Sequence, residues 1–349
     1  MPEIVIGSRT VGTGRPTYVV AEMSANHNQD LDRAKAIVRA AHEAGADAIK
    51  LQTYTPDMMT IDCANEHFRI GPGTAWEGDT LYDLYRRAAT PWEWHPALRD
   101  LALELGLDFF STPFDGSAVR FLEELGVPAY KVASFEITDV ELLGRIGATG
   151  KPVIMSTGMA TLDEIEEAVQ TLRGAGAGGL ALLKCTSAYP APVEDINLRT
   201  IPHLAAAFNV PVGLSDHTLG IEVAVSAVAL GATIIEKHLT LSRDDPTPDA
   251  GFSLEPNEFR MMSAAVRNCE KALGGIVYGV AEAERRSAVF RRSLFAVEDI
   301  AEGAPFSEKN VRSIRPGSGL HPRYLKDVLG RRARHPIARG TPLSWDLVC

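Results

Sequence analysis

Two lysines lie inside apolar runs of the sequence, where a positive charge is unusual. Lys50 belongs to the run DAIKLQ and Lys131 to the run AYKVAS. A buried ammonium group loses its hydration and is costly unless an anion accompanies it. The two lysines could therefore converge on one phosphate group, with hydroxyls of Thr112, Ser134 and Ser156 donating hydrogen bonds to it.

Two histidines end neighbouring apolar runs. His217 follows GLSD and His238 ends TIIEKH. Imidazoles at adjacent strand ends can share a divalent ion, with oxygen ligands and water filling the other positions. The alternative is two unrelated polar histidines. Six of the other histidines are expected at the surface: His42, His67, His95, His203, His321 and His335. His27, in the loop after the first apolar run, is the exception.

Glu22 ends the first apolar run, inside AEMSANHN. A carboxylate there could act as a general base toward a hydroxyl group or water. It could equally form an ion pair with one of the lysines, and the two roles are compatible. For any single serine or threonine at a strand end, a helix N-cap is the competing interpretation.

Eight short apolar runs alternate with amphipathic stretches between residues 17 and 275. Most show no apolar-polar alternation, which is typical of parallel strands buried on both faces. Glycines at 45, 106, 126 and 150 lie where helices should end. The pattern predicts a (β/α)8 barrel with its chemistry at the carboxyl ends of the strands. A doubly wound sheet is the alternative, but no Gly-x-Gly-x-x-Gly turn follows the first run. The expected strands are 17–23, 47–52, 108–112, 129–134, 152–157, 180–185, 211–216 and 233–238, after a hairpin at about 1–15 that caps the barrel floor.

The bulk composition limits the class of protein. With 349 residues, 45% hydrophobic and 23% charged, the chain fits one large globular domain and a small one. No apolar run approaches the ~20 residues of a membrane span, and the start lacks a signal-peptide layout, so a cytoplasmic protein without a membrane partner is expected. The cysteines (Cys63, Cys185, Cys269 and Cys349) are scattered, which favours reduced thiols.

Charge is unevenly distributed. From Arg285 to the end there are 13 Lys/Arg and 6 Asp/Glu, a net charge of +7. Because the whole chain carries −10, residues 1–284 carry −17. This asymmetry indicates either anion binding by the tail or docking of a basic tail on an acidic body. A nucleic-acid partner is not expected, because the acidic body would repel it.

Several segments in order along the barrel resemble the sialic acid synthase family, which makes nonulosonic acids from phosphoenolpyruvate. They are AEMSANHNQD, IKLQTYTPD, FFSTPFD, YKVASFEITD, MSTGMAT, KCTSAYPAP, GLSDHTLGIEVAVSAVALGATIIEKHLTL and FSLEP. Residues 291–322 resemble the family's C-terminal antifreeze-like (SAF, β-clip) domain, which is small and β-rich. The implied organisation is a barrel at 1–275, a linker at 276–290 and the small domain at 291–349.

The resemblance implies a role for each matching residue. Glu22 would be the catalytic carboxylate, and His217 and His238 would bind Mn²⁺ or Mg²⁺. In this family the small domain closes the partner's active site in a domain-swapped homodimer, so Arg315 would reach the sugar from the partner. Gln52, Glu136 and Asp249 would also face the sugar. Phosphoenolpyruvate would contact Lys50, Thr112, Lys131, Ser134, Ser156, Ser187, Tyr189 and Ser215.

Within the family the match is nearest to the pseudaminic branch, on IKLQTYTPD, TLYDLYRRAATPWEWH, LLKCTSAYPAP and GFSLEP. This implies condensation of phosphoenolpyruvate with 2,4-diacetamido-2,4,6-trideoxy-L-altrose. The alternative is an N-acetylneuraminate or legionaminate synthase, using N-acetylmannosamine or a 2,4-diacetamido-6-deoxy-mannose analogue. Thr247 stands where the family more often has glycine. The resemblance is therefore weaker in the loop around Asp249.

Other readings of the sequence remain open. A related barrel that condenses phosphoenolpyruvate with a sugar phosphate should carry a second Arg/Lys cluster, and no obvious one is present. The interpretation as a non-catalytic carbohydrate- or ice-binding protein is supported only by the C-terminal segment. The long segment from Thr53 to Trp92 carries Trp76, Tyr82, Tyr85 and Trp92, which could pack on a deoxy sugar or could anchor a lid or a subunit contact.

Overall fold

The computed structural model describes residues 2–74 and 76–349. The chain divides into two compact units, one ending at Gly274 and one from Gly275 to Cys349. Each has its own apolar core. They are described separately below.

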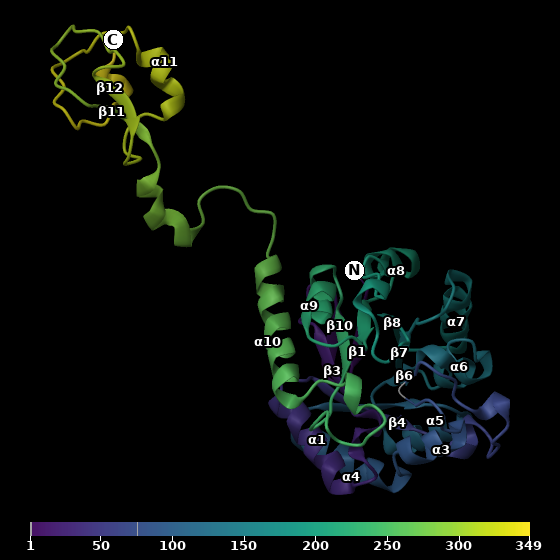
Figure 1. Ribbon diagram of the computed structural model, residues 1–349. Coiled ribbons are helices and arrows are strands. Elements are labelled where there is room, and N and C mark those ends of the chain that lie inside the picture. Colours follow the sequence, from purple (N-terminus) through teal and green to yellow (C-terminus); the bar gives the residue numbers. More distant parts are fainter. Residues whose placement is uncertain (1, 75) are drawn as a thin grey trace. The chain divides into compact units, whose positions relative to one another are not determined.

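The first unit is built on a closed barrel of eight parallel strands, with helices around the outside (Figure 1). The barrel closes where β10 pairs with β3, with His238 opposite Glu22, and Glu22 in turn lies opposite Lys50 of β4. Every strand expected from the apolar runs is present, so the predicted barrel is confirmed. The strands are β3 (Tyr18–Glu22), β4 (Ala48–Thr53), β5 (Asp108–Pro113), β6 (Tyr130–Val132), β7 (Pro152–Ser156), β8 (Gly179–Cys185), β9 (Val212–Asp216) and β10 (Ile234–His238).

A helix follows each barrel strand, and local signals set its ends. Asp30 caps the first helix by accepting hydrogen bonds from the N–H groups of Asp32 and Arg33. Gly126 ends another with φ +76, in the left-handed region that glycine adopts without steric cost. The helices are α1 (Leu31–Glu43), α4 (His95–Glu104), α5 (Gly116–Leu125), α6 (Val140–Gly147), α7 (Leu162–Ala175), α8 (Thr200–Phe208), α9 (Glu222–Ala229) and α10 (Pro256–Leu273).

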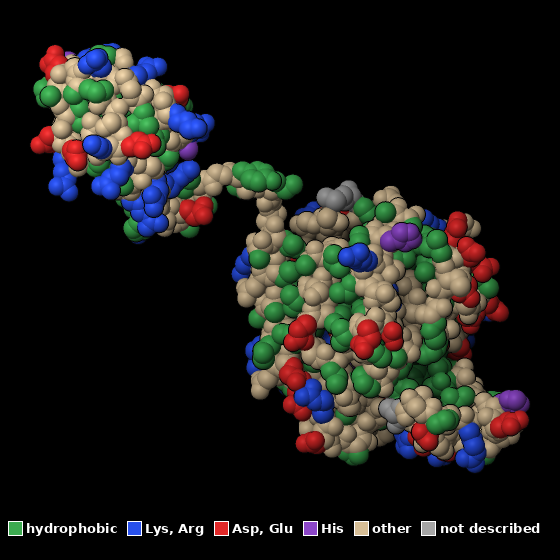
Figure 2. Space-filling view, turned by 45° about the horizontal axis from the view of Figure 1, so that its top comes forward, with side chains coloured by type: hydrophobic (Ala, Val, Ile, Leu, Met, Phe, Trp, Pro, Cys, Tyr) green, Lys and Arg blue, Asp and Glu red, His purple; other side chains and the backbone are tan. Residues whose placement is uncertain are grey.

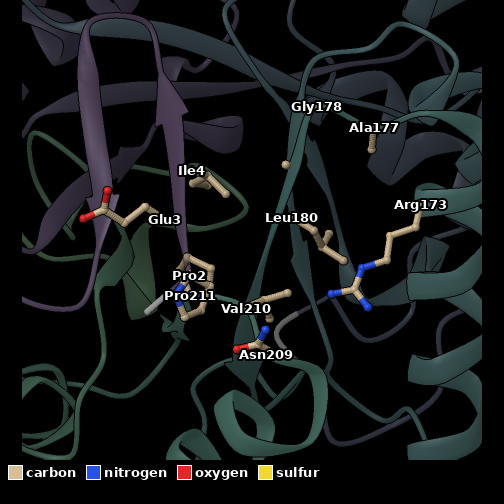
Figure 3. A pocket seen from close by; sticks show the side chains of 11 residues that line it. Pro2, Glu3, Ile4, Arg173, Ala177, Gly178, Leu180, Asn209, Val210 and Pro211 are labelled. Atoms are coloured by element: carbon tan, nitrogen blue, oxygen red, sulfur yellow. The ribbon is translucent and has the colours of Figure 1, made fainter.

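A hairpin of β1 (Glu3–Ile6) and β2 (Arg9–Gly12) covers the floor of the barrel, as predicted. Arg9 donates to Asp108 at 3.2 Å, and Asp108 lies at the amino end of β5. A pocket of about 240 Å³ lies beside the hairpin, near the start of β8. Figure 3 shows Ile4 of β1 on one side of this pocket and Arg173 of α7 on the other. It is therefore at the opposite end of the barrel from the predicted chemistry.

The long segment between β4 and α4 has structure of its own. It contains α2 (Pro56–Met59) and α3 (Leu81–Ala88). The prediction of a surface position for His95 is wrong, because this residue is completely buried. Its Nε2 lies 2.8 Å from Thr53 Oγ1, and its ring packs edge-on against Phe121, so it joins the end of β4 to α4 and α5. Burial lowers the pKa of His95 to about 4.

The second unit is small and mostly irregular. It contains the antiparallel pair β11 (Ser293–Ala296) and β12 (Val311–Ile314) and the short α11 (Leu325–Val328). Leu294, Phe306 and Leu343 belong to its core. Figure 2 shows Lys and Arg side chains spread over the visible face of this unit, as its net positive charge requires. Across both units, the described residues form no helix long and apolar enough to cross a membrane.

Candidate active site

Four charged side chains from different strands meet at the carboxyl end of the barrel. Lys50 of β4 forms an ion pair with Glu22 of β3. Glu236 of β10 lies 3.7 Å from Lys50 Nζ and 4.0 Å from Lys131 Nζ. All four are almost fully buried. The two lysines therefore lie near the same carboxylate, and Glu22 forms the ion pair that the sequence left open as one of its two roles.

Burial and pairing set the protonation of these groups. Burial raises the pKa of Glu22 to about 7, with Lys50 opposing the rise and Glu236 adding to it. Burial would also raise the pKa of Glu236, but the ammonium groups of Lys131 and Lys50 hold it below its ordinary value. Burial lowers the pKa of Lys131. A further anion beside the lysines would help to compensate their charge.

Hydroxyl groups surround the two lysines. Lys131 Nζ donates to Ser156 Oγ at 2.7 Å, and Lys50 Nζ donates to Thr112 Oγ1 at 3.3 Å. Ser215 Oγ donates to Glu236 Oε1 at 3.1 Å. Two more of the predicted hydroxyls, those of Ser134 and Ser187, lie together, as shown by a Cβ added to Gly158, which would collide with both. These groups could form a compact cradle for an anion.

His217 and His238 lie side by side, with ring centroids 5.2 Å apart. His217 Nδ1 lies 3.1 Å from the carbonyl oxygen of Thr186. Within residues 2–74 and 76–349, His238 Nδ1 is buried without a hydrogen-bond partner, and Asp249 Oδ2 lies 3.9 Å from it. Burial and the charges around it hold the pKa of His238 well below its ordinary value, so the ring is neutral. Neutral imidazole is the form that ligates metals.

A cavity of about 390 Å³ opens over this cluster. The sugar-facing candidates Gln52, Glu136 and Asp249 line it, and so does Tyr189. Glu22, Thr112 and Ser187 lie outside its wall, the first two in contact with Lys50. We call the lining residues Lys50, Lys131 and Glu236 the charged wall of the cavity, and the lining residues Met59, Ile70, Leu81, Leu84 and Phe114 its apolar wall. Arg315 belongs to the second unit.

Comparison with known proteins identifies this arrangement. The NeuB family matches residues 37–278, and the SAF domain matches residues 291–348. The chain belongs to the NeuB family. It is 44% identical to the pseudaminic acid synthase of Helicobacter pylori over 95% of this chain and 98% of that protein. It is 37% identical to the N,N'-diacetyllegionaminic acid synthase of Legionella pneumophila over 97% of each.

A solved structure gives the same result for the fold. The crystal structure of N-acetylneuraminic acid synthetase from Leptospira borgpetersenii, in complex with citrate, superposes with a TM-score of 0.73 at 32% identity. The match covers 82% of this chain and 94% of that one. The resemblance to the sialic acid synthase family that the sequence motifs indicated is therefore confirmed, with the barrel and the SAF domain in the expected order.

Some residues of this NeuB-family site were not assigned a role from the sequence. Glu236 is one of them, although it shares the inward face of β10 with His238, two positions on. The intervening Lys237 points the other way and pairs with Asp216 at 2.7 Å. Ser24, Tyr54, Cys185 and Phe252 also line the cavity.

The four aromatic residues that the sequence singled out in the 53–92 segment divide into two pairs. Trp76 and Tyr85 line the cavity, and Trp76 Nε1 donates to the carbonyl oxygen of Pro248 at 2.9 Å. The other two residues are not part of the cavity lining. The Tyr82 hydroxyl donates to Asp57 Oδ1 at 3.3 Å, and the Trp92 ring packs on Phe121.

Proposed function

We propose that this chain is a pseudaminic acid synthase, which condenses phosphoenolpyruvate with 2,4-diacetamido-2,4,6-trideoxy-L-altrose and releases phosphate. The observation that carries the proposal is the 44% identity to a pseudaminic acid synthase over nearly the whole of both chains. The identity to a legionaminic acid synthase is lower, at 37%. A cavity with one charged wall and one apolar wall agrees with a substrate pair of a phosphorylated acid and a deoxy sugar.

The charged wall would hold phosphoenolpyruvate. Lys50 and Lys131 would offset the charge of the phosphate and carboxylate groups, and Thr112 and Ser156 already contact them. Ser134, Ser187, Ser215 and Tyr189 would complete the cradle. This requires the lysines to exchange some of their present carboxylate contacts for substrate oxygens.

The two histidines would hold the family's divalent metal, which we propose to be Mn²⁺ or Mg²⁺. The paired rings and the unpartnered Nδ1 of His238 fit this role. In the described part of the chain, no group of three or more His, Cys, Asp or Glu side chains is arranged to hold an ion, so other ligands would be water or substrate. When bound, the metal supplies Lewis acidity toward the aldehyde oxygen of the sugar.

The protein groups place the reacting atoms. The methylene carbon of phosphoenolpyruvate attacks the aldehyde carbon. The phosphate-bearing carbon next to the methylene group then becomes electron-poor and water adds to it. Phosphate leaves from the resulting tetrahedral carbon. Glu22 would accept a proton from that water. Gln52, Glu136 and Asp249 would orient the open-chain sugar from the cavity wall.

The second unit would complete the site in a homodimer. We propose that residues 276–290 link the barrel to the SAF domain, and that Arg315 reaches the sugar bound by the partner subunit. We also propose that the enzyme works in the cytoplasm, where phosphoenolpyruvate is made.

A panel assay tests the proposed function. The purified protein is incubated with phosphoenolpyruvate, Mn²⁺ and each of several mono- and diacetamido hexoses, and both phosphate and product mass are measured. Highest kcat/KM with the 2,4-diacetamido-2,4,6-trideoxy-L-altrose substrate supports the proposal. Preference for N-acetylmannosamine would assign the chain to the sialic branch instead, and no phosphate release with any sugar would contradict a synthase.

A further inference from the structure

Ser24 has a backbone conformation that is unfavourable for serine. It lies two residues after the end of β3 and has φ +46, in the left-handed region where a Cβ clashes with the backbone. The same segment contains two other residues with positive φ, Asn28 at +51 and Gln29 at +55. Asparagine tolerates this region better than serine does, because its side chain bonds the local backbone. Unfavourable backbone of this kind is concentrated at functional sites.

The hydroxyl group of Ser24 joins two residues of the cavity wall. It donates a hydrogen bond to Asp249 Oδ2 and accepts one from Gln52 Nε2 at 2.9 Å. The N–H group of Ser24 donates to Glu22 Oε1 at 2.7 Å. A glycine at this position would relieve the backbone and keep the N–H group, but it would have no hydroxyl. The turn itself therefore does not need the serine side chain.

The backbone around Asp249 is held without help from Ser24. Ser253 Oγ donates to the carbonyl oxygen of Asp249 at 2.6 Å, and Asn26 Nδ2 donates to Ser253 Oγ at 2.9 Å. Thr247 Oγ1 donates to Asn26 Oδ1 at 2.9 Å. Because Asn26 fastens the loop in this way, the Ser24 hydroxyl acts on the direction of the Asp249 carboxylate and not on the position of the loop. That carboxylate lies between Ser24 and His238.

We propose that Ser24 is a positioning residue, whose hydroxyl orients the Asp249 carboxylate and the Gln52 amide toward the acetamido sugar. The inference rests on the proposed function, which places the sugar at Gln52 and Asp249. Its consequence is that sugar recognition and local stability conflict at one position. Glycine would favour the backbone, and serine favours the substrate.

Two substitutions separate these effects. Ser24→Gly removes both the hydroxyl and the unfavourable Cβ, whereas Ser24→Ala removes only the hydroxyl. Both variants should lower kcat/KM for the acetamido sugar by about 10- to 100-fold, the effect of losing a hydrogen bond to a charged group. The KM for phosphoenolpyruvate should change less than about twofold, since Ser24 contacts none of the hydroxyl cradle residues. Ser24→Gly should melt at a higher temperature than Ser24→Ala.

Asn28→Gly is the matched control, because it relieves a left-handed residue of the same segment outside the cavity wall. It should leave the KM of the sugar unchanged. A wild-type kcat/KM for the sugar in Ser24→Gly overturns the positioning role. Equal melting temperatures for Ser24→Gly and Ser24→Ala would contradict the claim that a side chain at this position lowers the stability of the fold. Failure of the proposed function is recognised separately, because the wild-type protein would then prefer N-acetylmannosamine in the panel or turn over no sugar at all.

Discussion

At the scale of single residues, the site depends on charged groups that the barrel removes from water. Glu136 shows the consequence most simply. It lines the cavity, its Oε2 is buried without a hydrogen-bond partner in the described residues, and burial raises its pKa to about 7, with Lys131 opposing. Its pKa in the folded protein is thus above the ordinary value of 4.5. The native state binds more protons between these values, so Glu136 lowers the unfolding free energy as the pH rises through about 7.

Glu136→Gln should therefore stabilise the protein at pH 8 and have little effect on stability at pH 4. A glutamine never ionises, and the difference at pH 8 should reach up to about 3 kcal/mol. Denaturant unfolding at both pH values measures it. Glu104→Gln, at an exposed position of α4, is the control and should show no such pH dependence. A difference for Glu136→Gln that does not vary with pH would contradict the burial argument.

The paired histidines give a second prediction at this scale. His217→Ala or His238→Ala should abolish turnover and leave the melting temperature within a few degrees, because His217 follows β9 and His238 ends β10 at the carboxyl end of the barrel. The exposed His203→Ala should retain full activity. A chelator should inactivate the wild-type enzyme reversibly, with activity returning on addition of Mn²⁺. Full turnover in excess chelator would rule out a required metal.

At the scale of elements, the sequence predicts what buried strands determine and little else. The eight strands are readable because each is a short apolar run that is covered on both faces. The positions of Lys50, Lys131, His217 and His238 follow from the barrel rule that strand ends meet. The segment between β4 and α4 was not predictable, because its helices and the buried His95 depend on tertiary contacts such as the one with Thr53. Side chains two positions apart in a strand share a face, so the assignment of His238 to the site would also have predicted Glu236 there.

The β4–α4 segment determines the apolar wall, so it should control the choice of sugar. Tyr85→Ala should reduce the kcat/KM preference for a 6-deoxy diacetamido sugar over N-acetylmannosamine, by about 10-fold or more. Trp76→Ala should act in the same direction and also loosen the contact with Pro248. Tyr82→Ala is the matched control, since this aromatic residue of the same helix as Tyr85 lies outside the cavity wall. Equal effects of Tyr82→Ala and Tyr85→Ala would assign these aromatic residues to anchoring the segment.

At the scale of the whole molecule, the proposed function would divide the chemistry between the two units. The barrel carries the charged cluster, the histidines and the cavity, and the second unit carries Arg315 with a net positive charge. Each unit has its own core, so a substitution in one should leave the folding of the other intact. A proposed site that takes its barrel from one subunit and its Arg315 from the other can therefore be tested by mixing two inactive full-length proteins.

Glu22→Ala disables the barrel, and Arg315→Ala disables the contribution of the second unit. Each variant alone should be almost inactive. After subunit exchange, half of the dimers are mixed and each holds one intact composite site, so activity should recover to about one quarter of the wild-type value. Arg339→Ala alone should remain active, because it removes an exposed arginine of the same unit without touching Arg315. Exchange is verified by native mass spectrometry of differently tagged subunits. If mixed dimers form and no activity returns, each site is built from a single chain, and Arg315 acts within its own subunit or not at all.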